Sequence, residues 1–358
     1  MRGLVGALLA ASCACGARSA LELPTREPDG GAIDRPAADV DPDVPCANGP
    51  IPLRRRASVA LLAIDRSGSM DLDLLGGNGV PRRWDVMRAV LPDALAALDP
   101  DVSLGALLFP PVGAAECAAP QALDLGFGEA RAEPVARVLD AARPSGRTPT
   151  YATLVQAERQ LQGATRDGAR VVVLATDGGP NCNAALDGDR CGCATGARVP
   201  GQDECRADPS LCLDDQRAVA QASAMAARGV LTFVIGIDGD RRPALVDALT
   251  RLARAGGRPN PRSPRAYYSV QRPEDLREAV DAIGRTLSAC TLLAAARPPA
   301  DATLSLRVRG ALAPRDPSRV EGWDWLTPDG AELALYGSAC DAAGGGAEVT
   351  LTASCGDR

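Results

Sequence analysis

The stretch Ser58-Val-Ala-Leu-Leu-Ala-Ile-Asp65-Arg-Ser67-Gly-Ser69 decides the fold of this chain, because an apolar run ends abruptly in a carboxylate and two hydroxyl side chains. Parallel strands covered on both faces are nearly continuous apolar runs, and in open α/β sheets ligands bind beyond the carboxyl ends of such strands. The stretch therefore predicts a buried strand whose end presents Asp65, Ser67 and Ser69 to a binding site.

These three side chains form an oxygen-only donor set. A carboxylate with two nearby hydroxyls, and without imidazole or thiolate, suits a hard cation such as Mg²⁺ better than zinc. Short polar stretches of this kind also form ordinary turns. Further segments of the chain are therefore needed to indicate a metal site.

Two such segments exist. The apolar run from Arg170 to Thr176 also ends in an aspartate, Asp177, and a loop that contains Thr148 opens a helical pattern between the two runs. In a doubly wound sheet the first strand and the strand after the crossover are neighbours. Asp65 and Asp177 are therefore expected to meet, and Thr148 can approach them from a third direction.

These segments resemble the metal-ion-dependent adhesion site of von Willebrand factor type A domains. The resemblance covers roughly residues 56–290 and implies an α/β fold with a doubly wound, mostly parallel six-stranded sheet of Rossmann-like topology. It also implies a bound divalent cation, Mg²⁺ with Mn²⁺ or Ca²⁺ as alternatives. The hydroxyls would bind it directly or nearly so, and the carboxylates directly or through water. The motif matches in the family's order, with first-loop, second-loop and third-loop residues Asp65, Ser67, Ser69, Thr148 and Asp177.

The resemblance further implies that the cation keeps one coordination position open for an Asp or Glu carboxylate of a protein partner. Three neutral hydroxyls and at most two negative charges leave the cation electrophilic enough to attract that anion. Two acidic residues after the first loop, Asp71 and Asp73, either serve a second cation or belong to a solvated helix start.

The composition excludes several function classes. The formal net charge of −6 offers no basic surplus to neutralise phosphates, so nucleic acid is not an expected partner. The chain has no histidine, which excludes Ser-His-Asp and Cys-His hydrolases. We expect a binding protein rather than an enzyme. Two alternatives stay open: a metal-dependent hydrolase built on two aspartates, and a structural envelope component whose metal only stabilises the fold.

The N-terminal residues predict export. A short apolar run that ends in Ser-Cys13-Ala-Cys15 resembles a bacterial lipoprotein signal over residues 1–15, with Cys15 or Cys13 as the lipidated residue; an ordinary secretory signal is the alternative. The run is shorter than the ~18 residues that a spanning helix needs. We expect a protein of the bacterial cell envelope, attached to the membrane by a lipid anchor only, and otherwise secreted or periplasmic.

Cysteines in an exported chain indicate disulfides rather than metal clusters. The chain has 12 cysteines, and those beyond Cys15 are even in number, which predicts five disulfides. A long Cys-rich insert over residues 180–213 directly follows Asp177; zinc held by four of its thiolates is the alternative. We expect this insert to set partner choice. Replacing residues 181–212 by a short linker should then remove recognition but leave cation binding nearly unchanged.

Strand and helix patterns alternate up to residue 290, which is typical of a parallel α/β sheet. The expected domains are the signal (1–15), a flexible tether (16–55), the type A domain (56–290) and a small β-rich module (291–358). Within the type A domain we expect strands at 58–64, 102–109, 122–127, 170–176, 230–237 and 266–270, and helices at 84–98, 132–142, 151–162, 214–228, 243–254 and 273–287.

Overall fold

The computed structural model describes residues 48–74, 80–98, 102–128, 132–164, 169–194, 204–237, 243–299, 301–327 and 329–355. The predicted signal, its two candidate lipidated cysteines (Cys13 and Cys15) and the tether up to residue 47 lie outside the described residues. Across the part of the chain that is described, no helix is both long and apolar enough to cross a membrane.

The central sheet has the predicted doubly wound topology. Its strand order is β5-β4-β3-β6-β7-β8, and all neighbouring pairs are parallel except β4 and the edge strand β5. The order reverses between β3 and β6, which pair along their whole length up to Ile64 and Ala175. The strands are β3 (Ser58–Asp65), β4 (Ser103–Phe109), β5 (Leu125–Gly128), β6 (Ala169–Thr176), β7 (Val230–Ile237) and β8 (Tyr268–Val270).

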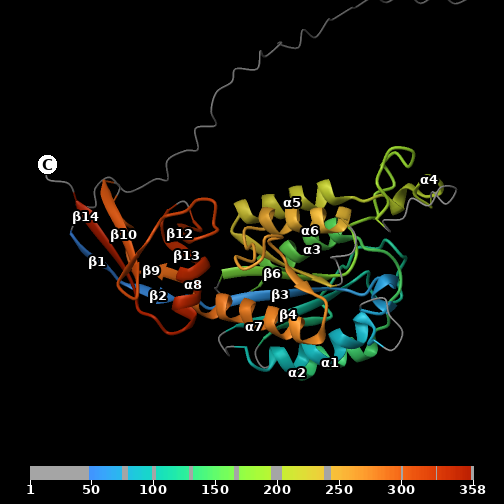
Figure 1. Cartoon of the computed structure of the whole chain (residues 1–358), viewed down its shortest axis with the longest axis horizontal. Helices are drawn as coiled ribbons and strands as arrows, with labels where there is room; N and C mark the ends of the chain where they lie inside the picture. Colours follow the sequence, from blue (N-terminus) through green and yellow to red (C-terminus); the bar gives the residue numbers. More distant parts are fainter. Residues whose placement is uncertain are drawn as a thin grey trace, which may run out of the picture. The chain divides into compact units, whose positions relative to one another are not determined.

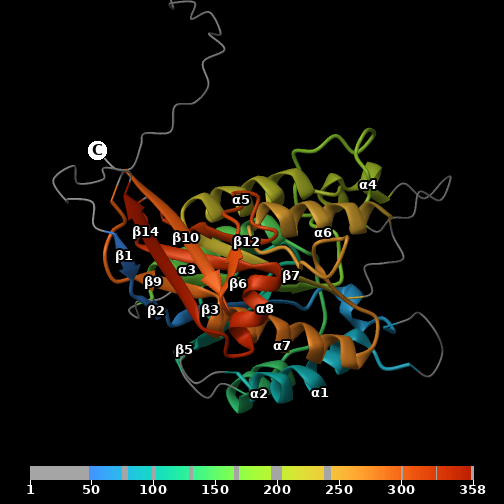
Figure 2. The same ribbon diagram turned by 60° about the vertical axis from the view of Figure 1, so that its left-hand side comes forward.

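Helices cover both faces of this sheet (Figure 1), and the same layers are visible after rotation (Figure 2). Side chains of β3 alternate between two hydrophobic clusters, so that Leu62 and Leu61 face opposite helix layers. The first layer contains α1 (Arg83–Leu95), α2 (Ala132–Ala141) and α7 (Pro273–Ala289); the second contains α3 (Thr150–Gln162), α5 (Asp215–Ala227) and α6 (Pro243–Ala255).

Two small antiparallel sheets form a second part of the molecule, with strand orders β1-β14-β10-β11 and β12-β13-β9-β2. Both sheets contribute side chains to one hydrophobic cluster that includes the buried Trp323, so they pack face to face. The elements are β1 (Gly49–Ile51), β2 (Leu53–Arg55), β9 (Thr291–Ala294), β10 (Ala302–Val308), β11 (Ala311–Ala313), β12 (Gly322–Trp325), β13 (Glu332–Tyr336), α8 (Gly337–Gly344) and β14 (Val349–Cys355).

The strands β1 and β2 differ from expectation, because their residues fall within the tether predicted over residues 16–55. Strand β1 pairs with β14 and β2 pairs with β9, both antiparallel. Strands of three residues are too short to show an alternating pattern, and their partners lie about 240 to 300 residues later in the chain. The central α/β part is therefore inserted between two neighbouring strands of the β part, β2 and β9.

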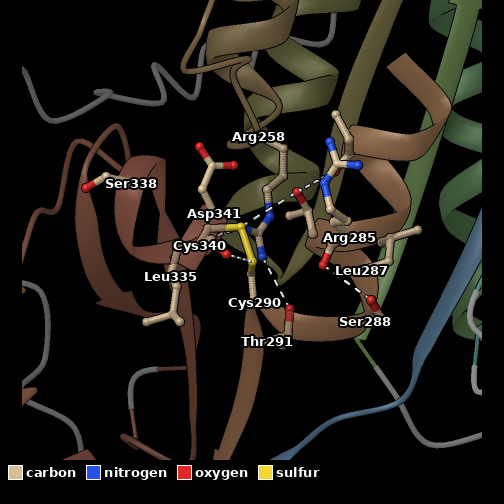
Figure 3. The surroundings of a disulfide bond; sticks show 12 residues. Arg258, Arg285, Leu287, Ser288, Cys290, Thr291, Leu335, Ser338, Cys340 and Asp341 are labelled. Atoms are coloured by element: carbon tan, nitrogen blue, oxygen red, sulfur yellow. Dashed lines mark hydrogen bonds between the residues drawn. A yellow bond between two sulfur atoms is a disulfide. The ribbon is translucent and has the colours of Figure 1, made fainter. Parts of the chain in front are cut away.

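Side-chain bonds join the β part to the α/β part. The disulfide Cys290–Cys340 connects the end of α7 to α8. Figure 3 shows Arg258 beside this disulfide; its guanidinium donates hydrogen bonds to Thr291 Oγ1 and to the Leu335 carbonyl, both at 3.3 Å. These bonds, with the hydrophobic cluster around Trp323, hold the two parts together.

Candidate metal centre

The sheet brings the two predicted aspartates together at the carboxyl ends of its two central strands. Asp65 is the last residue of β3, and Asp177 directly follows β6, the strand that pairs with β3. Both side chains are fully buried. Two carboxylates without a counter-charge repel each other in such a place, so their meeting requires a compensating cation, hydrogen-bond donors or protonation.

The predicted hydroxyls converge on these carboxylates. Ser67 Oγ lies 3.1 Å from Ser69 Oγ, and Ser69 Oγ donates to Asp177 Oδ1 at 2.8 Å. A Cβ atom at Gly178 would lie 3.0 Å from Thr148 Oγ1 and 3.7 Å from an Asp65 carboxylate oxygen. Gly178 thus lies next to both the Thr148 hydroxyl and Asp65, and a side chain there would crowd the hydroxyl.

The spacing of these oxygens suits a small hard cation. Mg²⁺ binds six oxygens at about 2.0–2.1 Å in an octahedron, so neighbouring ligand atoms are about 3 Å apart. The separations between Ser67, Ser69 and Asp177 oxygens, 3.1 and 2.8 Å, are close to that value. The donor set contains no nitrogen or sulfur, which fits Mg²⁺ or Mn²⁺ better than zinc.

Hydrogen bonds position the Asp65 carboxyl group but do not fully offset the free-energy cost of ionising it. One of its carboxylate oxygens accepts from the Ser67 backbone N–H at 2.8 Å, and the other accepts from Thr176 Oγ1 at 2.5 Å. Burial, and secondly the charge of Asp177, raise the pKa of Asp65 to about 7. A cation bound beside Asp65 would favour the ionised form of its carboxyl group.

The loop that carries Thr148 is held by the beginning of the insert. The Thr148 backbone N–H donates to Asn181 Oδ1 at 2.8 Å, and the Asn181 N–H donates to the Thr148 carbonyl at 2.9 Å. The next residue, Cys182, forms a disulfide with Cys117. Arg147 pairs with Asp208, farther along the insert, at 2.7 Å. The insert therefore packs directly against the second loop of the site.

Sequence reasoning missed two arginines that support the site. The buried guanidinium of Arg66, within the first loop, donates to the carbonyls of Pro110, Pro111 and Arg143 at 2.6–2.7 Å. It thus ties the first loop to the loops that follow β4 and α2. The second, Arg83, forms an ion pair with Asp177. An arginine in the first turn of a helix opposes the helix dipole, a signal that could have identified Arg83 from the sequence.

Asp71, one of the two residues considered for a second cation, forms an exposed ion pair with Arg82 at 2.8 Å. The neighbouring Asp73 forms an isolated β-bridge with the same arginine. Both observations agree with the alternative of a solvated helix start.

Every cysteine among the described residues is disulfide-bonded, as predicted. Sulfurs of Cys191, Cys205 and Cys212 lie within 4.8 Å of one another, the proximity that the zinc alternative requires. In the structure these sulfurs belong to two separate disulfides. The pairs are Cys117–Cys182, Cys191–Cys212, Cys193–Cys205 and Cys290–Cys340, and Cys355 is also disulfide-bonded.

Comparison with known proteins gives only distant similarities. No protein-family model and no curated protein matches the chain. Among solved structures it is similar to BatB from Bacteroides thetaiotaomicron (18% identity, TM-score 0.32, 50% of this chain and 66% of that chain). It is also similar to the pilus adhesin SpaC from Lactobacillus rhamnosus GG (14%, 0.45, 83% and 39%). A third is the manganese-loaded TRAP protein of Plasmodium vivax (17%, 0.39, 66% and 76%). The chain spans less than two thirds of the BatB and SpaC chains, and similarities this distant do not indicate a shared function.

Proposed function

We propose that this chain is a von Willebrand factor type A-like binding protein of the bacterial cell envelope, which uses a divalent cation to capture an acidic group of a protein partner. The observation that carries the proposal is the cluster of Ser67, Ser69 and Asp177 oxygens, with neighbours 2.8–3.1 Å apart, at the reversal point of the sheet beside the buried Asp65. The proposed ligands are Asp65, Ser67, Ser69, Thr148 and Asp177.

Each ligand has a distinct role in this proposal. The hydroxyls of Ser67, Ser69 and Thr148 supply neutral oxygens, and Asp65 and Asp177 supply the negative charge that retains a dication. The bound cation would supply an electrophilic position for an Asp or Glu carboxylate of the partner. Helix α3 begins two residues after Thr148, and its N-terminal amides favour an anion at the same place.

The proposed location follows from chemistry of the cysteines and of the N-terminus. Disulfides persist in oxidising compartments outside the cytosol, and every described cysteine is in one. The N-terminal segment resembles a lipoprotein signal, so attachment by a lipid on Cys15 or Cys13 is part of the proposal. A hydrolase is not proposed, because the chain has no histidine to serve as the usual general base.

Titration of Mg²⁺ into chelator-treated protein tests the site. Isothermal calorimetry should show one binding site that Asp65→Ala abolishes, while the circular dichroism spectrum stays that of the wild type. Asp71→Ala is the matched control, because it removes an exposed carboxylate near the same loop and should bind Mg²⁺ normally. Wild-type Mg²⁺ affinity in Asp65→Ala would show that the site is assigned to the wrong residues.

Capture of a partner tests the function beyond metal binding. Immobilised protein should retain a specific protein from envelope extract in Mg²⁺ and release it when the cation is chelated, with the fold intact by circular dichroism. Capture that persists in chelator, alongside a fold that melts at lower temperature without Mg²⁺, would support a purely structural metal instead.

A further inference from the structure

The proposed metal site contains a cation of its own. Arg83, the first residue of α1, is only 7% exposed, and its guanidinium forms an ion pair with Asp177 Oδ2. The same guanidinium nitrogen donates to the Ser69 carbonyl at 3.3 Å. The other oxygen of that carboxylate, Asp177 Oδ1, accepts from Ser69 Oγ at 2.8 Å. Asp177 is therefore shared between the hydroxyl cluster on one side and a guanidinium on the other.

Helix formation does not explain this arginine. A positive charge in the first turn of a helix opposes the helix dipole. Taking a guanidinium out of water is also unfavourable unless a carboxylate and further hydrogen bonds compensate. The neighbouring Arg82 shows the ordinary alternative, since its side chain is 56% exposed and pairs with Asp71 at the surface. The ion pair with Asp177 and the hydrogen bond to the Ser69 carbonyl thus favour the inward position of Arg83.

Resting on the proposed function, we propose that Arg83 is a built-in counter-cation that sets the charge of the metal site, weakening metal binding and keeping the empty site folded. A dication bound by Asp177 would lie beside the positive charge of Arg83, which pairs with the same carboxylate. Repulsion between guanidinium and metal, both near Asp177, lowers metal affinity. Without metal, the same guanidinium offsets the negative charge of the buried Asp177.

These two effects have opposite signs, which separates this role from a merely structural one. A residue that only packed or oriented Asp177 would, when replaced, lower both the stability of the metal-free protein and its Mg²⁺ affinity. A counter-cation, when replaced by a neutral side chain, lowers the first and raises the second. Arg83→Gln is the informative variant, because glutamine can still donate a hydrogen bond to Asp177 but carries no charge.

The experiment compares wild type, Arg83→Gln, Arg83→Lys and the surface control Arg82→Gln, with Mg²⁺ as the probe. Calorimetric titration should give Arg83→Gln a Kd at least tenfold lower than wild type, and its melting temperature in chelator should fall by several degrees. Arg83→Lys, which keeps the charge, and Arg82→Gln should stay within about threefold of wild type.

Unchanged or weaker Mg²⁺ binding by Arg83→Gln overturns the inference, as does failure of this variant to fold even in Mg²⁺. The proposed function fails separately: wild type and Arg83→Gln would then both bind no Mg²⁺. If Arg83→Gln alone bound Mg²⁺, the counter-cation role would be supported, and the native site would be shown to hold its own guanidinium in place of metal.

Discussion

At the scale of single residues, the candidate site is a problem of buried charge. Asp65 and Asp177 are fully buried, and Arg83 forms an ion pair with Asp177. Asp65 relies on hydrogen bonds from the Ser67 N–H and the Thr176 hydroxyl. Burial and the charge of Asp177 therefore raise the pKa of Asp65 to about 7. Ionisation of both carboxylates in the absence of metal therefore lowers the free energy of unfolding.

This arrangement predicts a pH dependence of the metal-free protein. Unfolded Asp65 loses its proton near pH ~4, whereas the folded protein keeps it until about pH 7. Between these values the folded state binds the extra proton, so the free energy of unfolding falls as pH rises from about 4 to about 7, and then levels off. One pKa unit corresponds to about 1.4 kcal/mol, so the loss is on the order of a few kcal/mol.

Urea unfolding in chelator at pH 5, 6, 7 and 8 measures this dependence, and Asp65→Asn is the control that lacks it. At pH 8 in chelator, Asp65→Asn should be more stable than wild type. Mg²⁺ affinity of the wild type should rise with pH up to about 7, because the metal requires the ionised carboxylate. Equal pH profiles for both proteins would mean that Asp65 titrates normally.

At the scale of elements, the beginning of the insert supports the candidate metal site, because it holds the loop that carries Thr148. Asn181 exchanges two hydrogen bonds with Thr148, and Cys182 is tied to Cys117. The insert closes at its base, where the Asp214 N–H donates to the Pro180 carbonyl at 2.7 Å. Replacing residues 181–212 would therefore remove support for Thr148. The sequence predicts that such a replacement leaves cation binding nearly unchanged. A test of partner choice alone requires a shorter deletion that keeps the support for Thr148.

Two deletions separate support from recognition. Replacing residues 184–211 keeps Asn181 and the Cys117–Cys182 disulfide, with Cys212 changed to Ser, and should keep Mg²⁺ affinity within about threefold while partner capture is lost. Extending the deletion to residue 181 should weaken Mg²⁺ binding by about tenfold or more, since each lost hydrogen bond contributes about 0.5–1.5 kcal/mol. Calorimetry and capture assays on both variants decide this. Equal Mg²⁺ affinity in the two would show that Asn181 does not position Thr148.

Local patterns explain which elements and site residues were predictable. Strands β3 and β6 are continuous apolar runs that end in Asp65 and Asp177, so both the strands and the site positions could be predicted. Strand β1 and helix α8 carry no such pattern: β1 has three residues, and α8 is rich in Gly and Ala. The role of Arg66 depends on contacts with distant loops, which no local pattern encodes, whereas the position of Arg83 in the first turn of a helix is a local signal.

At the scale of the whole molecule, the α/β part is inserted into the β part through the neighbouring strands β2 and β9. Strand β2 leads into the amino end of β3, and the candidate metal site lies at its carboxyl end. A strand of eight residues spans about 26 Å. The β part should therefore contribute to stability without contributing to metal affinity.

Two shortened chains test this, one beginning at Asn48 and the other at Ala57, so that they differ only in β1, β2 and the connecting residues. The shorter chain loses the buried Ile51 and leaves Glu332 without the ion pair that Arg56 provides. Burial of one isoleucine contributes about 1.5–3 kcal/mol, and a partly buried carboxylate left unpaired adds a further loss. We expect the free energy of unfolding to fall by at least about 3 kcal/mol, with Mg²⁺ affinity in the folded protein unchanged. Equal stability would mean that residues 49–55 act as a tether after all, and a drop in Mg²⁺ affinity would show that the β part is coupled to the metal site through β3.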